Sequence, residues 1–407
     1  GAAGPSYTLA LPALADSGAK FRVILSAPGV ASATSAEAVL TVLPDNAGPR
    51  VVSTYALVPT QVGVCFDEIL DAASASDPGV YSLGAGSVVE SATLLADGQS
   101  VVLTVTDLPG PAFTLTVTGI ADLKGNQNSD TVAGTNAGAL SFLDVGDVTE
   151  PGLVMACGPG PFTVRAGGAD IWLLADSFNF LHQEIQGDFD MRLQMTGISG
   201  GNGATRGGLM VREDETPGSR NVFVGTYAAT GDNHWVATYR DQPDANTFIV
   251  PDGYVVREPT FAYPSVWVRL QRTGQTFACF HSADGLNWTP LGSSFTPQTP
   301  YPDAVMVGIA SSSIFNAGPP PSARFGYDHY GPTPTDVEPP HLAIALAAGE
   351  VQLSWPLAAE GFVLQETGLL TATPAWTDVT VPPETVGDRR QVTLPTAGEA
   401  KFYRLAR

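Results

Sequence analysis

Short apolar runs with alternating polar positions recur along the whole chain, and glycine or proline separates them. In GDFDMRLQM, residues 187–195, an apolar side chain stands at every second position from Phe189 to Met195. Such a period of two places one face of a β-strand in a core and the other face in solvent. Helical periodicity is almost absent, so the pattern predicts an all-β protein with many tight turns.

The 407 residues are too many for one small core. We predict tandem β-sandwiches over 1–45, 46–144, 145–334 and 335–407. The segment TPTDVEPP separates the last two, because its prolines favour an extended spacer. The third segment has the size of a two-sheet jelly roll.

Residues 1–45 contain three expected strands: Tyr7–Leu11, Phe21–Ser26 and Ala36–Leu43. Between the first two, ALADSGAKFRV resembles the corner between the fifth and sixth strands of immunoglobulin-like domains, with Asp16, Gly18 and Phe21 at the matching positions. The resemblance implies the last three strands of a seven-stranded sandwich.

Three strands cannot bury both faces of a core. The remaining strands would come from sequence upstream of this chain, or from another chain by strand complementation. In the second case, subunit contacts would fall on Phe21, Val23 and Leu25. A surface filament built from copies of this chain would then follow.

Residues 46–144 repeat the alternation in VVSTYALV, QVGVCFDE, SVVLTVTDL and FTLTVTGI. They resemble bacterial immunoglobulin-like modules that carry V-x-F-(D/S)-E and D-x-x-G-N. The matching residues are Val64, Phe66, Asp67, Glu68, Asp122, Gly125 and Asn126. The resemblance implies a spacer in a surface protein.

One turn in this segment could bind Ca²⁺, the sole cofactor that the sequence suggests. GNQNSD offers oxygen atoms at alternate positions, from Asn126, Asn128 and Asp130. A run of this kind is more often a solvated turn.

Four motifs in residues 145–334 occur in the order typical of one family. They are ADIWLLADSFNFLHQEIQGDFDMRLQM, GGLMVRED, SRNVFV and VWVRLQRTGQTFACFHSADGLNWTPLG. This segment resembles the concanavalin A-like family related to DUF1349, which implies a laminin-G or lectin-like jelly roll. Residues 335–407 resemble C-terminal β-sandwich modules of large secreted planctomycete and verrucomicrobial proteins.

Carbohydrate binding on the jelly roll needs exposed aromatic faces and polar groups that orient hydroxyls. Arg212 is either such a group or half of a buried ion pair. Alternation places Trp235 and Tyr239 on one strand face, which can equally be core. The full candidate set is Trp172, Arg212, His234, Trp235, Tyr239, Arg240 and Tyr254.

Catalytic patterns are missing from the sequence. A glycosidase needs two carboxylates across the scissile bond, and Asp188 and Asp190 are the nearest pair on one strand face. A solvated strand face is the favoured explanation of this pair. Neither zinc-binding histidine spacing nor a Gly-x-Ser-x-Gly elbow occurs. We therefore predict no enzyme, with an unrecognised glycoside hydrolase as the least favoured alternative.

The formal net charge is −21, with three lysines in all. Phosphate backbones and anionic membrane surfaces are therefore excluded as partners. The cysteines are Cys65, Cys157 and Cys279. They are expected as buried apolar residues, or as a Cys157–Cys279 bridge with one free thiol.

These features together predict a secreted or cell-surface protein with a structural or adhesive role. Its expected partners are copies of itself or a polysaccharide. The alternative is a carbohydrate-binding appendage of a larger secreted enzyme.

Overall fold

A computed structural model describes all of the chain except residues 1–5, 8, 10–11, 27–31, 85, 109, 139, 230–231, 256–261, 315–321, 335–340, 348, 358, 360, 370–374, 388, 397–399 and 407, and the side chains of 228–229, 232–233 and 253–255. The described residues form two compact units, 1–332 and 333–407. Nearly all regular structure is β, as predicted; helix α1 (Ala72–Ala75) is one turn long. No described helix has the length and apolar character to cross a membrane.

The N-terminal strands form two short two-stranded sheets. β1 (Lys20–Phe21) pairs with β4 (Ala38–Val39), and β2 (Ile24–Leu25) pairs with β3 (Ala33–Thr34). Every residue in these four strands is exposed. The expected strand Tyr7–Leu11 falls largely outside the described residues. This segment therefore presents apolar side chains without a core of its own.

Residues 46–140 form a nearly closed sheet, which we call the 46–140 module. Its strands, in spatial order, are β7 (Tyr81–Leu83), β10 (Ala112–Ala121), β11 (Gln127–Asn136), β5 (Val51–Val58), β6 (Gln61–Phe66), β9 (Ser100–Val105) and β8 (Val89–Leu94). Alternation in β10 sends Phe113, Leu115 and Val117 into the core, and the threonines between them outward. The sheet thus encloses its apolar residues as the period of two requires.

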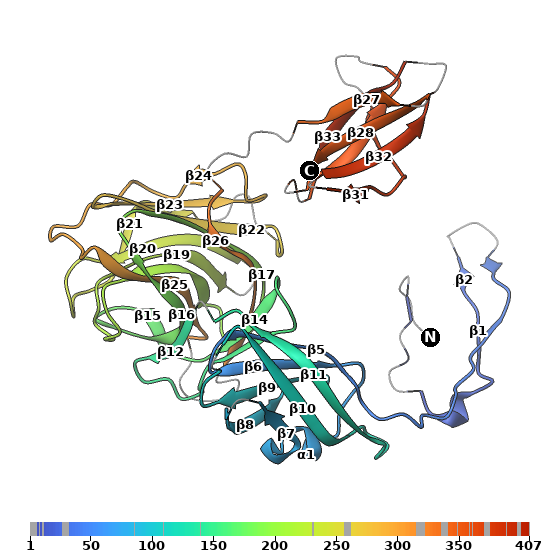
Figure 1. Ribbon diagram of the computed structural model, residues 1–407. Coiled ribbons are helices and arrows are strands. Elements are labelled where there is room, and N and C mark those ends of the chain that lie inside the picture. The colour runs from blue at the N-terminus through green and yellow to red at the C-terminus, as the bar shows by residue number, and fades with distance from the viewer. Residues whose placement is uncertain are drawn as a thin grey trace. The chain divides into compact units, whose positions relative to one another are not determined.

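The large sandwich comprises residues 141–332 and has two antiparallel sheets. The first sheet contains β12 (Ser141–Val145), β16 (Ala175–Gln186), β25 (Ala304–Ser312), β18 (Thr205–Arg212), β19 (Asn221–Ala229), β20 (Asp232–Arg240) and β21 (Phe248–Val255). The second contains β13 (Leu153–Ala156), β14 (Phe162–Ala166), β26 (Ala323–Pro332), β17 (Phe189–Gly200), β22 (Val266–Thr273), β23 (Thr276–Ser282) and β24 (Thr289–Pro290). The sheets pack against each other over one shared core (Figure 1).

A disulfide joins the 46–140 module to the large sandwich. Cys65 on β6 bonds Cys157, directly after β13, and Cys279 is the buried free thiol. The alternative Cys157–Cys279 bridge does not form, because Cys279 lies on β23 inside the sandwich core. Cys65 was expected as a buried apolar residue and is instead part of the bridge. Sequence spacing cannot show which strands of different modules meet.

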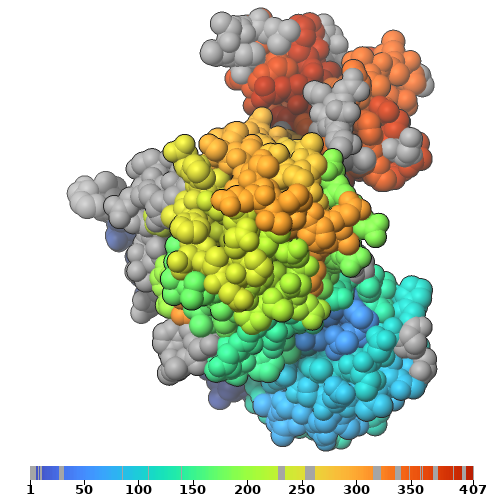
Figure 2. Space-filling model, turned by 90° about the vertical axis from the view of Figure 1, so that its left-hand side faces the viewer, coloured from blue at the N-terminus to red at the C-terminus, as the bar shows by residue number. Residues whose placement is uncertain are grey.

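The same interface contains two further close contacts. The Gln61 amide donates to the Gly152 carbonyl at 3.2 Å and accepts from the Val154 amide at 2.6 Å. Gly63 is needed because a Cβ there would stand 2.2 Å from the Ala156 carbonyl oxygen. Figure 2 shows the module, in blue and cyan, directly against the green part of the sandwich. Residues 46–332 are thus one continuous body.

A hairpin folds over the first sheet on the side away from the shared core. It consists of β15 (Asp170–Trp172) and the first residues of β16, and we call residues 170–177 the roof hairpin. Its Ile171 is fully buried with Met210, Phe223 and Val236 of the sheet. Both faces of this sheet are consequently buried, which explains why β18 is buried at every residue.

The C-terminal unit is a small two-sheet sandwich. One sheet has β27 (Ala343–Ala347), β28 (Glu350–Pro356), β32 (Arg389–Pro395) and β31 (Glu384–Val386); the other has β30 (Thr377–Asp378), β29 (Val363–Thr367) and β33 (Phe402–Ala406). Trp355 is the buried centre of its core. Trp376 is half-buried under the guanidinium of Arg404.

Candidate functional site

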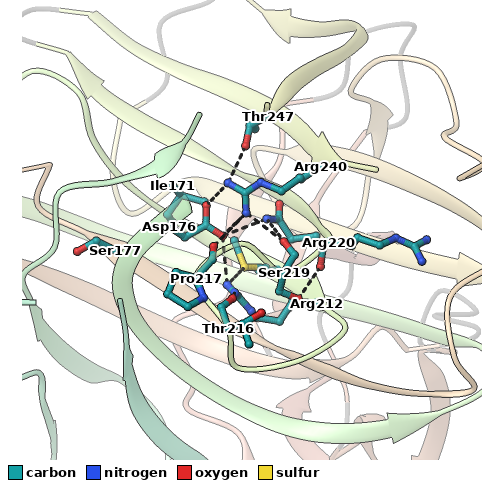
Figure 3. Close-up of polar contacts among 12 residues, drawn as sticks. Ile171, Asp176, Ser177, Arg212, Thr216, Pro217, Ser219, Arg220, Arg240 and Thr247 are labelled. Carbon is teal, nitrogen blue, oxygen red and sulfur yellow. Dashed lines mark hydrogen bonds and ion pairs between the residues drawn. The ribbon is translucent and has the colours of Figure 1, made fainter. Parts of the chain in front are cut away.

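A buried ion-pair cluster lies at one end of the first sheet of the large sandwich. Figure 3 shows Asp176, from the roof hairpin, between the guanidinium groups of Arg240 and Arg212. Arg240 Nη2 and Nη1 lie 2.7 Å and 2.8 Å from the two Asp176 oxygens, and Arg212 Nη1 lies 3.3 Å from Oδ2. All three side chains are completely buried. We call these three residues the latch.

The latch also holds three loops through their backbone carbonyls. Arg240 donates to the carbonyls of Leu173, Pro217, Ser219 and Ala245 and to the Thr247 hydroxyl. Arg212 donates to the carbonyls of Asp214 and Thr216. The loops 173–175, 213–219 and 241–247 are therefore fixed together. Burial lowers the pKa of the Arg212 guanidinium, and Asp176 opposes that shift.

Most of the seven residues considered for sugar binding are buried. Arg212 and Arg240 are in the latch. Of the two roles considered for Arg212, a sugar-binding group or half of a buried ion pair, the structure shows the ion pair. His234 and Trp235 are also buried, and the face that Trp235 shares with Tyr239 belongs to the shared core. The Tyr254 side chain lies outside the described residues. The six of these residues whose side chains are described form no exposed aromatic platform in this conformation.

Trp172 is half-buried at the side of the roof hairpin. The guanidinium of Arg206 lies 5.7 Å from its ring centroid and 4.2 Å from that of Tyr227. Arg206 also pairs with Asp170 at 3.0 Å and donates to the Ile171 carbonyl. These contacts hold the base of the hairpin, as the latch holds its far end.

Three exposed apolar side chains lie near one another above the latch, and sequence reasoning missed them. Leu173 and Leu174 form the turn of the roof hairpin, and Ile249 lies near the start of β21 on the same side of the sheet. The two segments are adjacent because the Leu173 carbonyl accepts from the Thr247 amide at 2.9 Å. Each side chain is between 40% and 62% exposed. We call these three residues the apolar tip.

Leu173 has a positive φ of 55°. That conformation costs a bulky residue about 1 to 3 kcal/mol and persists where the surroundings enforce it. Here the enforcing contacts are the hydrogen bonds that its carbonyl accepts from Arg240 and Thr247. The strained turn holds a leucine side chain in solvent, which favours a surface used for contact.

The three loops around the apolar tip are strongly acidic. Residues 173–175, 213–219 and 241–247 contain no lysine, arginine or histidine. Their carboxylates are Glu213, Asp214, Glu215, Asp241 and Asp244. We call these five residues the acidic rim. The site therefore combines an apolar centre with a negatively charged border, on a rigid support.

His182 lies on the side of the first sheet that the roof hairpin covers, and it stacks on Phe180 with ring centroids 4.8 Å apart. Neither ring nitrogen has a hydrogen-bond partner among the described residues. Burial, together with the nearby Arg212 charge, lowers the pKa of His182 to about 4. The imidazole is therefore neutral in the folded protein at neutral pH.

This pKa predicts a loss of stability in acid. The unfolded chain binds a proton near pH 6.5, whereas the folded chain does so only near pH 4. Stability is therefore complete above the unfolded pKa and falls by about 2 kcal/mol as the pH drops from about 6.5 to 5. His182→Phe should remove that part of the loss. Urea unfolding at pH 7.5 and pH 5 checks this, and an identical loss in both proteins would contradict it.

The two carboxylates considered for hydrolysis have structural partners. Asp190 forms a two-point ion pair with Arg269, with one contact at 2.7 Å, and accepts from Gln271. Asp188 accepts the Gly274 amide at 2.6 Å. Both side chains therefore fasten neighbouring strands of the second sheet.

The three residues considered for Ca²⁺ direct their polar groups to the backbone. Asn126 and Asn128 donate to the carbonyls of Asp45 and Pro49, and Asp130 accepts the Val51 amide. Another group of carboxylates converges nearby: Asp45, Glu68 and Asp122. Burial, and then those two neighbours, raise the pKa of Glu68. Asp122 already accepts hydrogen bonds from Asn126 and Lys124.

No protein-family model and no curated protein matches this chain. Solved structures do match, among them a functionally unknown protein from Saccharomyces cerevisiae, with 16% identity, 47% of this chain and 95% of that chain covered, and a TM-score of 0.36. A xylan β-1,4-xylosidase from Bacillus halodurans C-125 is 10% identical, with 59% of this chain and 52% of that chain covered and a TM-score of 0.30. Surface layer protein SbsC, domains 1–6, is 11% identical, with 88% of this chain and 53% of that chain covered and a TM-score of 0.23.

The chain spans about half the length of the xylosidase and of SbsC. The names of the matched proteins describe different activities, and one fold supports many functions. What this chain does must therefore be argued from its own residues.

Proposed function

We propose that this chain is a non-catalytic structural or adhesive protein that works outside the cell, and that its N-terminal strands complete a sandwich with a neighbouring chain. The observation that carries the proposal is the exposure of those strands. Phe21, Val23 and Leu25 are between 37% and 69% exposed. Contiguous exposed apolar residues of this kind mark interaction surfaces.

The disulfide supports a location outside the cell. A Cys65–Cys157 bridge between two parts of the body forms and persists in an oxidising compartment. The net charge of −21 supports solubility in such a setting.

The positions of the acidic pair support a structural role. A glycosidase needs one carboxyl group as acid and another as nucleophile or base, both facing the substrate. Asp190 is neutralised by Arg269, and Asp188 is bound to a hairpin amide. Both residues thus stabilise the second sheet in this conformation.

Sedimentation velocity over a range of protein concentrations tests the proposed association. We expect the average mass of the full chain to rise with concentration, and to stay at one chain in the double variant Val23→Asp, Leu25→Asp. Leu123→Asp changes a leucine that is equally exposed on the 46–140 module and should associate normally. A wild-type chain that remains a monomer throughout the range would reject the proposal.

A further inference from the structure

We propose that residues 20–25 of one copy bind the apolar tip of a second copy, so that copies associate head to tail. This inference rests on the proposed function, because it identifies the surface that covers the N-terminal strands. It commits to a second copy of this chain as the occupant of the tip. The argument uses apolar exposure, rigidity and charge complementarity.

The receiving surface is apolar and held in place. Leu173, Leu174 and Ile249 form one exposed group because the Leu173 carbonyl is bonded to Thr247 and Arg240. The latch beneath them is fully buried. A preorganised surface loses little conformational entropy on binding, so more of the contact energy contributes to affinity.

The donor segment reads KFRVIL, and each of its residues, from Lys20 to Leu25, is exposed. Phe21 on β1, Leu25 on β2 and Val23 between them are 37% to 69% exposed, which suits them to the apolar tip. Both strands of a two-stranded ribbon are edges, so the long Arg22 side chain can reach round the ribbon while its stem covers apolar surface.

Charge selects this pairing over other contacts between copies. Two molecules that each carry −21 repel one another over most of their surfaces. Residues 20–25 contain no carboxylate and offer Arg22, while Lys20 pairs with Glu37 at 2.9 Å. The acidic rim supplies five carboxylates around the tip, of which Glu213 pairs with Arg220 at 3.6 Å. Apposed patches of opposite sign favour the correct encounter and suppress the wrong ones.

The contact joins two different surfaces of the same chain. Such a heterologous interface leaves one donor and one acceptor free at the ends of each assembly, and it produces open chains unless the rotation closes a ring. The geometry thus gives a surface structural protein a route to linear assembly.

The first test compares acceptor variants with the wild type by sedimentation velocity. Leu173→Asp, Leu174→Asp should weaken association about tenfold or more, because the centre of the contact becomes charged. The fold should be kept, since aspartate tolerates the positive φ of Leu173 better than leucine does. Leu123→Asp is the matched control and should behave as wild type.

A mixing experiment tests the polarity of the contact. The chain with Val23→Asp, Leu25→Asp retains only the acceptor, and the chain with Leu173→Asp, Leu174→Asp retains only the donor. Each alone should be monomeric, and an equimolar mixture should form pairs of one copy each and nothing larger. Longer assemblies in the mixture would overturn the proposed polarity.

A charge exchange tests the role of the rim. Glu215 is exposed, and Glu215→Lys should weaken association about threefold to tenfold through lost attraction. Adding Arg22→Glu to the same chain should restore part of the loss. Glu90→Lys, an exposed change of the same sign on the 46–140 module, should have no effect.

The outcomes separate this inference from the proposed function. If the donor variants abolish association and the tip variants leave it unchanged, the N-terminal strands bind elsewhere and this inference fails while the proposed function stands. If the wild type has the mass of one chain at every concentration, both this inference and the proposed function are rejected.

Discussion

Replacing Asp176 with alanine is expected to lower the free energy of unfolding by about 3 to 5 kcal/mol. The change removes the one carboxylate that lies between Arg212 and Arg240, and leaves two guanidinium groups buried side by side. Water cannot compensate them, because all three side chains are completely buried. Urea-induced unfolding of the purified variant and wild type measures the difference.

The matched control is Asp188→Ala. Asp188 is an exposed aspartate of the same sandwich with one hydrogen bond, to the Gly274 amide. Its loss should cost about 1 kcal/mol. If Asp176→Ala and Asp188→Ala lower the free energy of unfolding by the same amount, the latch is not a stabilising cluster. Because Arg240 also holds the Leu173 turn, Asp176→Ala should impair self-association as well.

Removal of the Cys65–Cys157 bridge has the second large expected effect. The bridge closes a loop with a sequence separation of 92 residues. Constraint of the unfolded chain by a loop of that length contributes roughly 4 to 5 kcal/mol. The double variant Cys65→Ala, Cys157→Ala should lose about that much stability, measured by urea unfolding at neutral pH.

Cys279→Ala serves as the comparison for this prediction. It removes the buried free thiol, whose pKa burial raises to about 12, and it leaves the bridge intact. Reducing agent should destabilise the wild type and Cys279→Ala alike, and should leave the double variant unchanged. Equal stability of wild type and double variant without reductant would contradict the role assigned to the bridge.

Local patterns in the sequence predicted local structure well. The alternation in GDFDMRLQM became β17, with Phe189, Met191 and Leu193 in the core. The turn SADGLNW has Gly285 at a φ of 71°, as a tight hairpin requires. Such features depend on neighbours along the chain, which a single sequence displays directly.

Features that depend on distant residues could not be predicted in this way. Asp176 meets Arg212 and Arg240 from 36 and 64 positions away, and no spacing marks the three as partners. The roof hairpin also buries the second face of the first sheet, so alternation fails in β18. The exposure of the consecutive leucines of the apolar tip follows from the latch beneath them, which no local pattern in the sequence shows.

The bridge between Cys65 and Cys157 also determines how the chain responds to mechanical tension. Force applied between residues before 65 and residues after 157 passes through the two sulfur atoms. The intervening segment, a separation of 92 residues, is thereby shielded from stretching. Reduction would release roughly 300 Å of extra contour length. An oxidised molecule under load is consequently much less extensible than its reduced form.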